Sequence, residues 1–202
     1  MDYVNLRPLK ESDIEYIIVH HYGGNATMKE EHDNALSKGW TGFPYNSTIL
    51  KTGERVEGRG LNRGAHAGDY NGKSWGVALQ GNYEIDTITT LQYNALVDEL
   101  IYLQKRFPKA KIVGHRELMA TLCPGENIDM IKVRQDVFSA KIESEIKDVN
   151  DISVYALGSV LKYYDKKVFT GDEKGNFNPK NSISREDFAV VLDRFEKYLR
   201  AD

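Results

Sequence analysis

Short apolar segments of strand length alternate with helix signals over most of the chain, and this alternation limits the possible folds more than any other feature. The first segment, residues 16–19, is a tyrosine followed by β-branched residues, and it runs into His20-His21 and the turn residues Gly23-Gly24. Further strands are expected at 45–50, 55–58, 75–79 and 111–113, and helices at about 27–39, 89–107 and 128–138. This order predicts an α/β fold with a mixed central sheet and flanking helices.

Capping residues indicate where two of these helices begin. Thr27 is followed three residues later by Glu30, and Thr89 by Gln92. That spacing is typical of a capping box, in which the two side chains bond to each other's backbone N–H groups. The second helix must end before Pro108, because proline disfavours a helical conformation in the residue that precedes it.

The pattern changes after about residue 139, where charged residues replace apolar ones. We therefore predict a first domain at residues 1–140, a charged linker at 141–150 and a small helical C-terminal domain at 151–202. The last region has apolar residues at helical spacing, then a loop rich in glycine and asparagine over 170–179, and a final helix after Ser184. A helical unit of this size is marginal for folding alone.

Charge and hydropathy exclude two classes of partner. The net charge of −3 provides no basic surface for nucleic acid. No apolar run approaches the roughly 20 residues that a membrane-spanning helix needs, so we expect no membrane partner. The first residues, Met1 to Val4, lack the layout of a signal peptide, which predicts a protein made in the cytoplasm.

Three histidines and the single cysteine have the side chains best suited to metal chemistry. His20 and His21 end the first predicted strand, His115 follows the last one, and Cys123 lies in the loop beyond it. Zinc binds imidazole nitrogen and thiolate sulfur, and a catalytic site leaves one position for water. Taken singly, each residue also fits a structural role, since an isolated cysteine is usually a small buried side chain. Together they indicate a metal site.

Seven short motifs follow one another over about residues 12–138. They are Tyr16-Ile17-Ile18-Val19-His20, Gly39-Trp40 with Tyr45, Gly58-Arg59-Gly60, Gly64-Ala65-His66-Ala67, Tyr70-Asn71, Gly114-His115-Arg116-Glu117 and Cys123-Pro124-Gly125. Together they resemble the zinc N-acetylmuramoyl-L-alanine amidases, a family that includes phage amidase endolysins and the peptidoglycan recognition proteins. A set of motifs in this order is far more specific than any one of them.

The resemblance implies a zinc ion bound by His20, His115 and Cys123. Phage-type members carry Val-His at the end of the first strand, which matches His20. Some recognition proteins use the second histidine of a pair, which here is His21. Because successive strand residues point to opposite faces of a sheet, only one of the two can be the ligand, and we favour His20.

The resemblance also implies roles for four residues around the metal. Tyr45 would lie beside the zinc-bound water and stabilise the oxyanion, and Thr121 takes the position where phage members often carry a catalytic lysine. His66 and Asn71 match residues that line the substrate groove. Two of them have a structural alternative: Tyr45 as a strand aromatic, and His66 as the polar anchor of a surface loop.

A second set of motifs occupies about residues 146–198. They are Ile146-Lys147-Asp148-Val149, Val168-Phe169-Thr170-Gly171-Asp172, Gly175-Asn176-Phe177-Asn178-Pro179 and Ser184-Arg185-Glu186-Asp187. They resemble one S-layer homology motif, a family that binds secondary cell-wall polysaccharide. Arg185 is the expected partner of an acidic sugar, because guanidinium binds carboxylate in a bidentate manner. The alternative is an ion pair with a carboxylate in its own helical turn.

The S-layer homology family usually packs three such motifs together, and this chain contains one. Either one motif suffices for binding, or several chains supply the others. The second alternative predicts a homo-oligomer that forms through the tail.

Both resemblances together predict an enzyme that hydrolyses the amide bond between N-acetylmuramic acid and L-alanine in peptidoglycan. The predicted cofactor is Zn²⁺, and the predicted role is that of an endolysin that acts on the bacterial cell wall after release. Two other hypotheses stay open. One is a non-catalytic peptidoglycan-binding module with the same fold, and the other is a peptidase that uses the same site to cut within the stem peptide.

Overall fold

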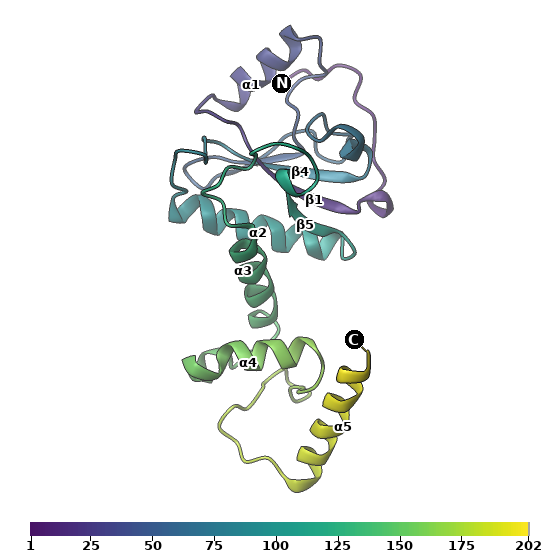
Figure 1. Ribbon diagram of the computed structural model, residues 1–202, viewed down its shortest axis with the longest axis vertical. Coiled ribbons are helices and arrows are strands. Elements are labelled where there is room, and N and C mark those ends of the chain that lie inside the picture. The colour runs from purple at the N-terminus through teal and green to yellow at the C-terminus, as the bar shows by residue number, and fades with distance from the viewer. Residues whose placement is uncertain (202) are drawn as a thin grey trace. The chain divides into compact units, whose positions relative to one another are not determined.

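The computed structural model describes residues 1–201 (Figure 1). It divides into two compact units, Met1–Val137 and Phe138–Asp202. Helix α3 (Met130–Glu143) begins in the first unit and ends in the second. None of the helices in the described part of the chain is long and apolar enough to cross a membrane.

A five-stranded mixed sheet forms the centre of the first unit. Its strands are β1 (Tyr16–His21), β2 (Ser47–Ile49), β3 (Arg55–Glu57), β4 (Ser74–Leu79) and β5 (Lys111–Gly114). In the order β3-β2-β4-β1-β5, β1 pairs in parallel with both β4 and β5, β2 pairs in parallel with β4, and only β3 is antiparallel. Both neighbours of β1 are strands, and its residues 17–21 are buried, as its apolar sequence predicts.

Two helices of this unit begin at the predicted caps. Helix α1 (Met28–Ser37) has the complete capping box of Thr27 and Glu30. Helix α2 (Thr90–Arg106) has half of one, because the Thr89 side chain accepts a hydrogen bond from the Gln92 N–H. The Gln92 amide instead donates to the carbonyls of Ile49 and Gln80, and so fastens α2 to the sheet.

A buried polar network also joins α2 to the sheet. Glu99 on α2 accepts hydrogen bonds from the Ser47 hydroxyl and the Arg55 guanidinium, and the Trp75 indole donates to Ser47. The carboxylate is almost fully buried, and Arg55 supplies its counter-charge. Pairing of this kind is what allows a charged group to remain in a protein interior.

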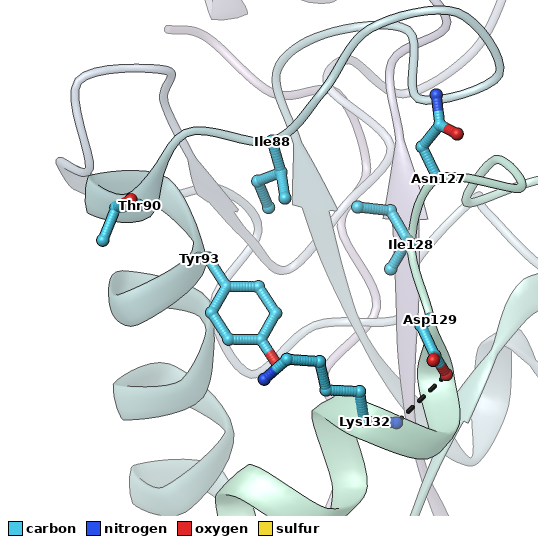
Figure 2. Close-up of a pocket in the computed structure, with 7 residues that line it drawn as sticks. All are labelled: Ile88, Thr90, Tyr93, Asn127, Ile128, Asp129 and Lys132. Atoms are coloured by element: carbon cyan, nitrogen blue, oxygen red, sulfur yellow. Dashed lines mark hydrogen bonds between the residues drawn. The ribbon is translucent and has the colours of Figure 1, made fainter.

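A pocket lies between α2 and the beginning of α3 (Figure 2). Tyr93 on α2 donates its hydroxyl to Asp136, and Lys132 pairs with the same carboxylate. Asp129 accepts hydrogen bonds from the first N–H groups of α3, including that of Lys132. The charged and phenolic side chains of this pocket, Tyr93, Asp129 and Lys132, are therefore already engaged with Asp136 or with the start of α3.

The second unit contains helices α4 (Val154–Asp165) and α5 (Arg185–Ala201) together with the end of α3. Its core is a cluster of buried residues, and Phe177 of the loop packs against it; the cluster consists of Ile142, Ile146, Ile152 and Leu161. The unit is helical, as predicted, and with the mixed sheet it confirms the expected fold class.

Residues 141–150 differ from the predicted linker. They contain the last turn of α3, and Ile142 and Ile146, four residues apart, are both buried in the cluster of the second unit. Asp148 accepts hydrogen bonds from the N–H groups of Phe177 and Asn178. The charged residues of this stretch favour a solvated linker, yet its two isoleucines face inward, Ile142 from the last turn of α3 and Ile146 from the turn that follows the helix.

Candidate metal centre

The pairing of β1 with β5 brings His20 and His115 together. The two strands are parallel, and Val19 is opposite Gly114. The next residue of each chain segment is therefore a histidine at the same edge of the sheet. The two imidazole rings lie 4.5 Å apart between centroids. Neither strand contains this information by itself, because it depends on the register of the pair.

Backbone and side-chain hydrogen bonds hold Cys123 at the same place. The Arg116 N–H donates to the Cys123 carbonyl (2.7 Å), and the Arg116 guanidinium donates to the carbonyls of Gly125 and Ile128. Thr121, predicted at a catalytic position, accepts a hydrogen bond from the Cys123 N–H (3.2 Å). Arg116 and Thr121 thus shape the loop that presents the sulfur.

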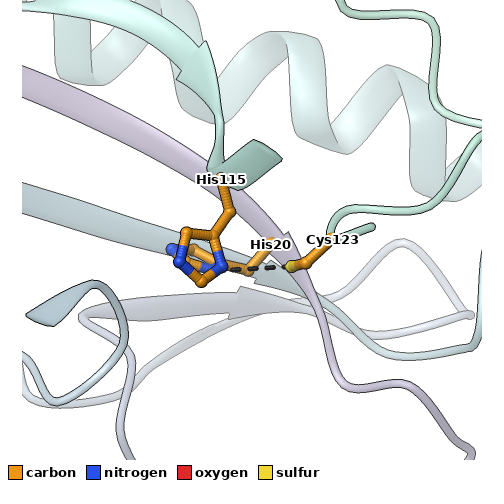
Figure 3. Close-up of side chains that lie close together, drawn as sticks. All are labelled: His20, His115 and Cys123. Atoms are coloured by element: carbon orange, nitrogen blue, oxygen red, sulfur yellow. Dashed lines mark hydrogen bonds between the residues drawn. The ribbon is translucent and has the colours of Figure 1, made fainter. Parts of the chain in front are cut away.

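The nearest possible ligand atoms of His20, His115 and Cys123 all lie within 4.8 Å of one another (Figure 3). Nδ1 of His20 is 3.6 Å from Sγ of Cys123. A tetrahedral zinc ion with Zn–N near 2.0 Å and Zn–S near 2.3 Å separates these two donors by about 3.5 Å. Two imidazoles and one thiolate are also a donor set that zinc accepts. These residues therefore fit a zinc ion.

The titration behaviour of the two histidines agrees with that assignment. Burial lowers the pKa of His20 well below its usual range, and nearby histidines add to the effect; burial also lowers the pKa of His115. Both rings are therefore neutral at pH 7, as coordination requires. Burial raises the pKa of the Cys123 thiol to about 11, and the His21 N–H, 3.4 Å from Sγ, opposes that shift.

His21 lies on the opposite face of β1 and outside this cluster. Its Nδ1 accepts a hydrogen bond from the Tyr83 N–H at 3.1 Å, and its Nε2 lies 3.9 Å from the Glu84 carboxylate. The structure therefore brings His20, and not His21, to His115 and Cys123.

Tyr45 stands beside His20, with 5.0 Å between the ring centroids. Its hydroxyl makes one long hydrogen bond, 3.4 Å, to the His21 carbonyl. Burial raises the pKa of Tyr45 far above its usual range, so the phenol keeps its proton and acts as a donor. The loop before Tyr45 is held by Arg59, whose guanidinium donates to the carbonyls of Gly42 and Phe43.

The two predicted groove residues are placed differently from each other. Nδ1 of His66 lies 3.0 Å from Nε2 of His20, so His66 reaches the metal cluster. The Asn71 side-chain oxygen accepts hydrogen bonds from the N–H groups of His66 and Ala67, both at 2.8 Å. Asn71 thus anchors the loop that carries His66. Burial lowers the pKa of His66 to about 3, so this ring is neutral as well.

Sequence motifs did not single out two further residues near the site. Sδ of Met119 lies 3.3 Å from Nε2 of His115. Asn46 is buried, donates to the carbonyls of Gly60 and Asn62 and accepts from the Gly76 N–H, which fixes the chain next to Tyr45. The sequence feature that could have indicated Met119 is its position four residues after His115, a spacing at which side chains of one helical turn meet.

In the second unit, Arg185 is the exposed first residue of α5. The helix is capped by Ser184, whose hydroxyl accepts from the Asp187 N–H at 3.0 Å and donates to the Asp187 carboxylate at 2.6 Å. Within the described residues, Arg185 makes no ion pair. Its guanidinium is therefore available to an external ligand.

Comparison with known families supports the two sequence resemblances. The model of the N-acetylmuramoyl-L-alanine amidase family matches residues 10–126, and that of the S-layer homology domain matches residues 145–189. The chain is 33% identical over 133 residues to peptidoglycan-recognition protein SC2 of Drosophila simulans, covering 58% of this chain and 71% of that protein. It is 36% identical over 95 residues to an N-acetylmuramoyl-L-alanine amidase of Sus scrofa, covering 45% of this chain and 16% of that protein.

Solved structures show the same fold. The N-acetylmuramoyl-L-alanine amidase LysC from Clostridium intestinale superposes with a TM-score of 0.62 at 25% identity, covering 68% of this chain and 94% of that one. Drosophila PGRP-LB superposes with a TM-score of 0.56 at 26% identity, covering 63% and 83%. Since the family match extends over more than half of its residues, the chain belongs to the N-acetylmuramoyl-L-alanine amidase family, and an S-layer homology domain follows the amidase domain.

Proposed function

We propose that this protein is a zinc-dependent amidase that cleaves the bond between N-acetylmuramic acid and L-alanine in peptidoglycan. The observation that carries the proposal is the convergence of His20, His115 and Cys123, with the Tyr45 phenol beside them. Family membership and the names of the relatives, which include amidases and peptidoglycan recognition proteins, support the substrate class.

In the proposed mechanism, His20, His115 and Cys123 would hold the metal, and its chemistry when bound would be to polarise the scissile carbonyl and to lower the pKa of a water molecule. Tyr45 donates its hydroxyl proton in a hydrogen bond to the carbonyl oxygen as that oxygen gains negative charge. Its raised pKa keeps the donor protonated throughout. The hydroxyl has only the long contact to the His21 carbonyl to give up, so little is lost when it turns to the substrate.

We propose that the second unit attaches the enzyme to the cell wall through secondary cell-wall polysaccharide. The S-layer homology match and the exposed guanidinium of Arg185, which makes no ion pair with any described residue, support this role. Attachment would raise the effective concentration of the amidase domain at its substrate. In this proposal the protein acts as a lytic enzyme on the wall after its release from the cytoplasm.

Mass spectrometry of digested peptidoglycan tests the proposed reaction. The expected products are stem peptides with a free N-terminal L-alanine and glycan chains with an unsubstituted lactyl group. Peptides with new termini inside the stem would instead identify a peptidase. Binding to peptidoglycan without any product would identify a non-catalytic module, and the Cys123→Ser variant is the matched control for background cleavage.

A further inference from the structure

Both candidate histidine ligands have the same ring nitrogen occupied by a neighbouring side chain. Nε2 of His20 lies 3.0 Å from Nδ1 of His66, and Nε2 of His115 lies 3.3 Å from Sδ of Met119. The nitrogen left over in each ring is Nδ1. In His20 this is the atom that lies 3.6 Å from the Cys123 sulfur.

We propose that His66 and Met119 are positioning residues that hold the rings of His20 and His115 so that both present Nδ1 to the metal. The proposal rests on the proposed function, since it assumes a metal at this site. It gives His66 a role through His20, in place of the groove contact that the sequence predicts. A ligand histidine whose second N–H is held by a partner has a fixed tautomer and a fixed ring orientation.

The packing around His66 leaves its ring little freedom. A Cβ atom built on Gly64 would lie 2.2 Å from Cδ2 of His66, and one built on Gly76 would lie 2.7 Å from both Cδ2 and Nε2. Any side chain at either position would displace the ring. The two glycines and the Asn71 anchor therefore set where Nδ1 of His66 points.

The other nitrogen of His66 supports a role beyond packing. To accept a hydrogen bond at Nδ1, the neutral ring must carry its proton on Nε2. That atom is buried and has no hydrogen-bond partner among the described residues. An unpaired buried donor is unfavourable and uncommon in folded proteins, so a residue kept only for packing would be better replaced by an apolar one. The hydrogen bond between Nδ1 of His66 and Nε2 of His20 explains why position 66 carries a histidine and not an apolar residue.

Met119 holds His115 by a weaker contact. The Met119 N–H bonds to the His115 carbonyl at 3.1 Å, which keeps the two residues within one turn of the chain, and Sδ of Met119 meets Nε2 of His115. A thioether is a weak acceptor, and Met119 is 40% exposed. We therefore expect loss of the Met119 sulfur to weaken metal binding less than loss of His66.

Nuclear magnetic resonance of the full chain loaded with cadmium-113 tests the coordinating atom without any variant. A metal on Nδ1 is three bonds from the Hε1 proton alone, whereas a metal on Nε2 is three bonds from both Hε1 and Hδ2. We expect coupling to Hε1 only for both His20 and His115. Coupling to both ring protons of either histidine would overturn the assignment for that histidine and its partner.

Matched variants test the two partners. His66→Leu removes the acceptor and His66→Asn keeps an oxygen near the position of Nδ1; Met119→Leu removes the sulfur and Met119→Gln supplies an amide oxygen. We expect the zinc dissociation constant, measured by competition with a chromogenic chelator, to rise about 10- to 100-fold for His66→Leu and by less for Met119→Leu. The Asn and Gln variants should recover part of that loss.

Circular dichroism shows whether each Leu variant is folded. A folded Leu variant that binds zinc with wild-type affinity would overturn the positioning role of the residue it replaces. If a Leu variant does not fold, the cadmium couplings of the unmodified chain still decide whether the histidine bound by that residue coordinates the metal through Nδ1. These measurements contain no substrate. A protein that binds metal through both Nδ1 atoms yet releases no L-alanine stem peptides would contradict the proposed function and leave this proposal standing.

Discussion

Sγ of Cys123 lies 3.6 Å from Nδ1 of His20, although 103 residues separate them in the chain. One atom belongs to the last-but-one residue of β1, and the other to a loop fastened by Arg116. Their separation is close to that of a nitrogen and a sulfur ligand on one tetrahedral zinc ion, about 3.5 Å.

Removal of one metal ligand should remove the metal. We expect near-stoichiometric zinc in the purified full chain by elemental analysis, and loss of most of it in Cys123→Ser and His20→Ala. His21→Ala is the matched control, because His21 faces the other side of β1 and bonds to Tyr83. Full zinc content in Cys123→Ser, or zinc loss confined to His21→Ala, would contradict the ligand set.

The hydroxyl of Tyr45, and not its ring, is assigned to the reaction. Tyr45→Phe should keep the fold and the zinc content, because the hydroxyl makes only the 3.4 Å contact to His21. Turnover of soluble muropeptides should fall roughly 100-fold or more, as for the loss of one oxyanion donor. A variant that turns over at the wild-type rate would remove Tyr45 from the mechanism.

Wall attachment is assigned to Arg185 in the second unit. Arg185→Ala should weaken sedimentation of the full chain with purified cell walls, because the exposed guanidinium makes no ion pair among the described residues and is available to an acidic wall polymer. Cleavage of small soluble muropeptides should not change. Arg200→Ala is a matched control, since Arg200 also lies on α5 but pairs with Glu196. Equal sedimentation of wild type and Arg185→Ala would contradict this assignment.

The loop of the second unit should be sensitive to acid. Hydrogen bonds from the Asn176 N–H, then from the side chains of Asn178 and Asn176, lower the pKa of Asp172 to about 2 from its ordinary 3.8. Because the folded pKa is depressed, the stabilising effect is present above about pH 4 and is lost as the pH falls towards 2. The amide resonances of Asn176 and Lys174 should move across that window in the full chain, and the Asp172→Asn variant should lack the transition.

The exposed apolar side chains of α5 predict that the chain self-associates through its tail. Helix α5 exposes about half or more of the side chains of Phe188, Leu192 and Leu199, and apolar faces of this kind favour association. Light scattering of the full chain at micromolar concentration should give a mass above that of a monomer. The double change Phe188→Glu and Leu192→Glu should return it to a monomer. A wild-type chain that is already monomeric would contradict the prediction.

Much of the fold could be predicted because its signals are local. The β-branched run at residues 16–19, the pairing of Thr27 with Glu30, and Pro108 each act within one strand or one helical turn. The boundary between the two units was harder to predict from the sequence. Ile142 and Ile146 lie among charged residues, and only the packing of α4 shows that they are core.

The sequence by itself determined the elements, the types of candidate ligand and the family, since residue type and short-range spacing suffice for these. The tertiary structure decided which atoms meet. Val19 pairs with Gly114, and this register places His20 beside His115. The packing of His66 against Gly76 brings the His66 ring to His20. Strand register and the contacts between distant loops depend on the whole folded chain, because a shift of one residue would move His20 to the opposite face of the sheet.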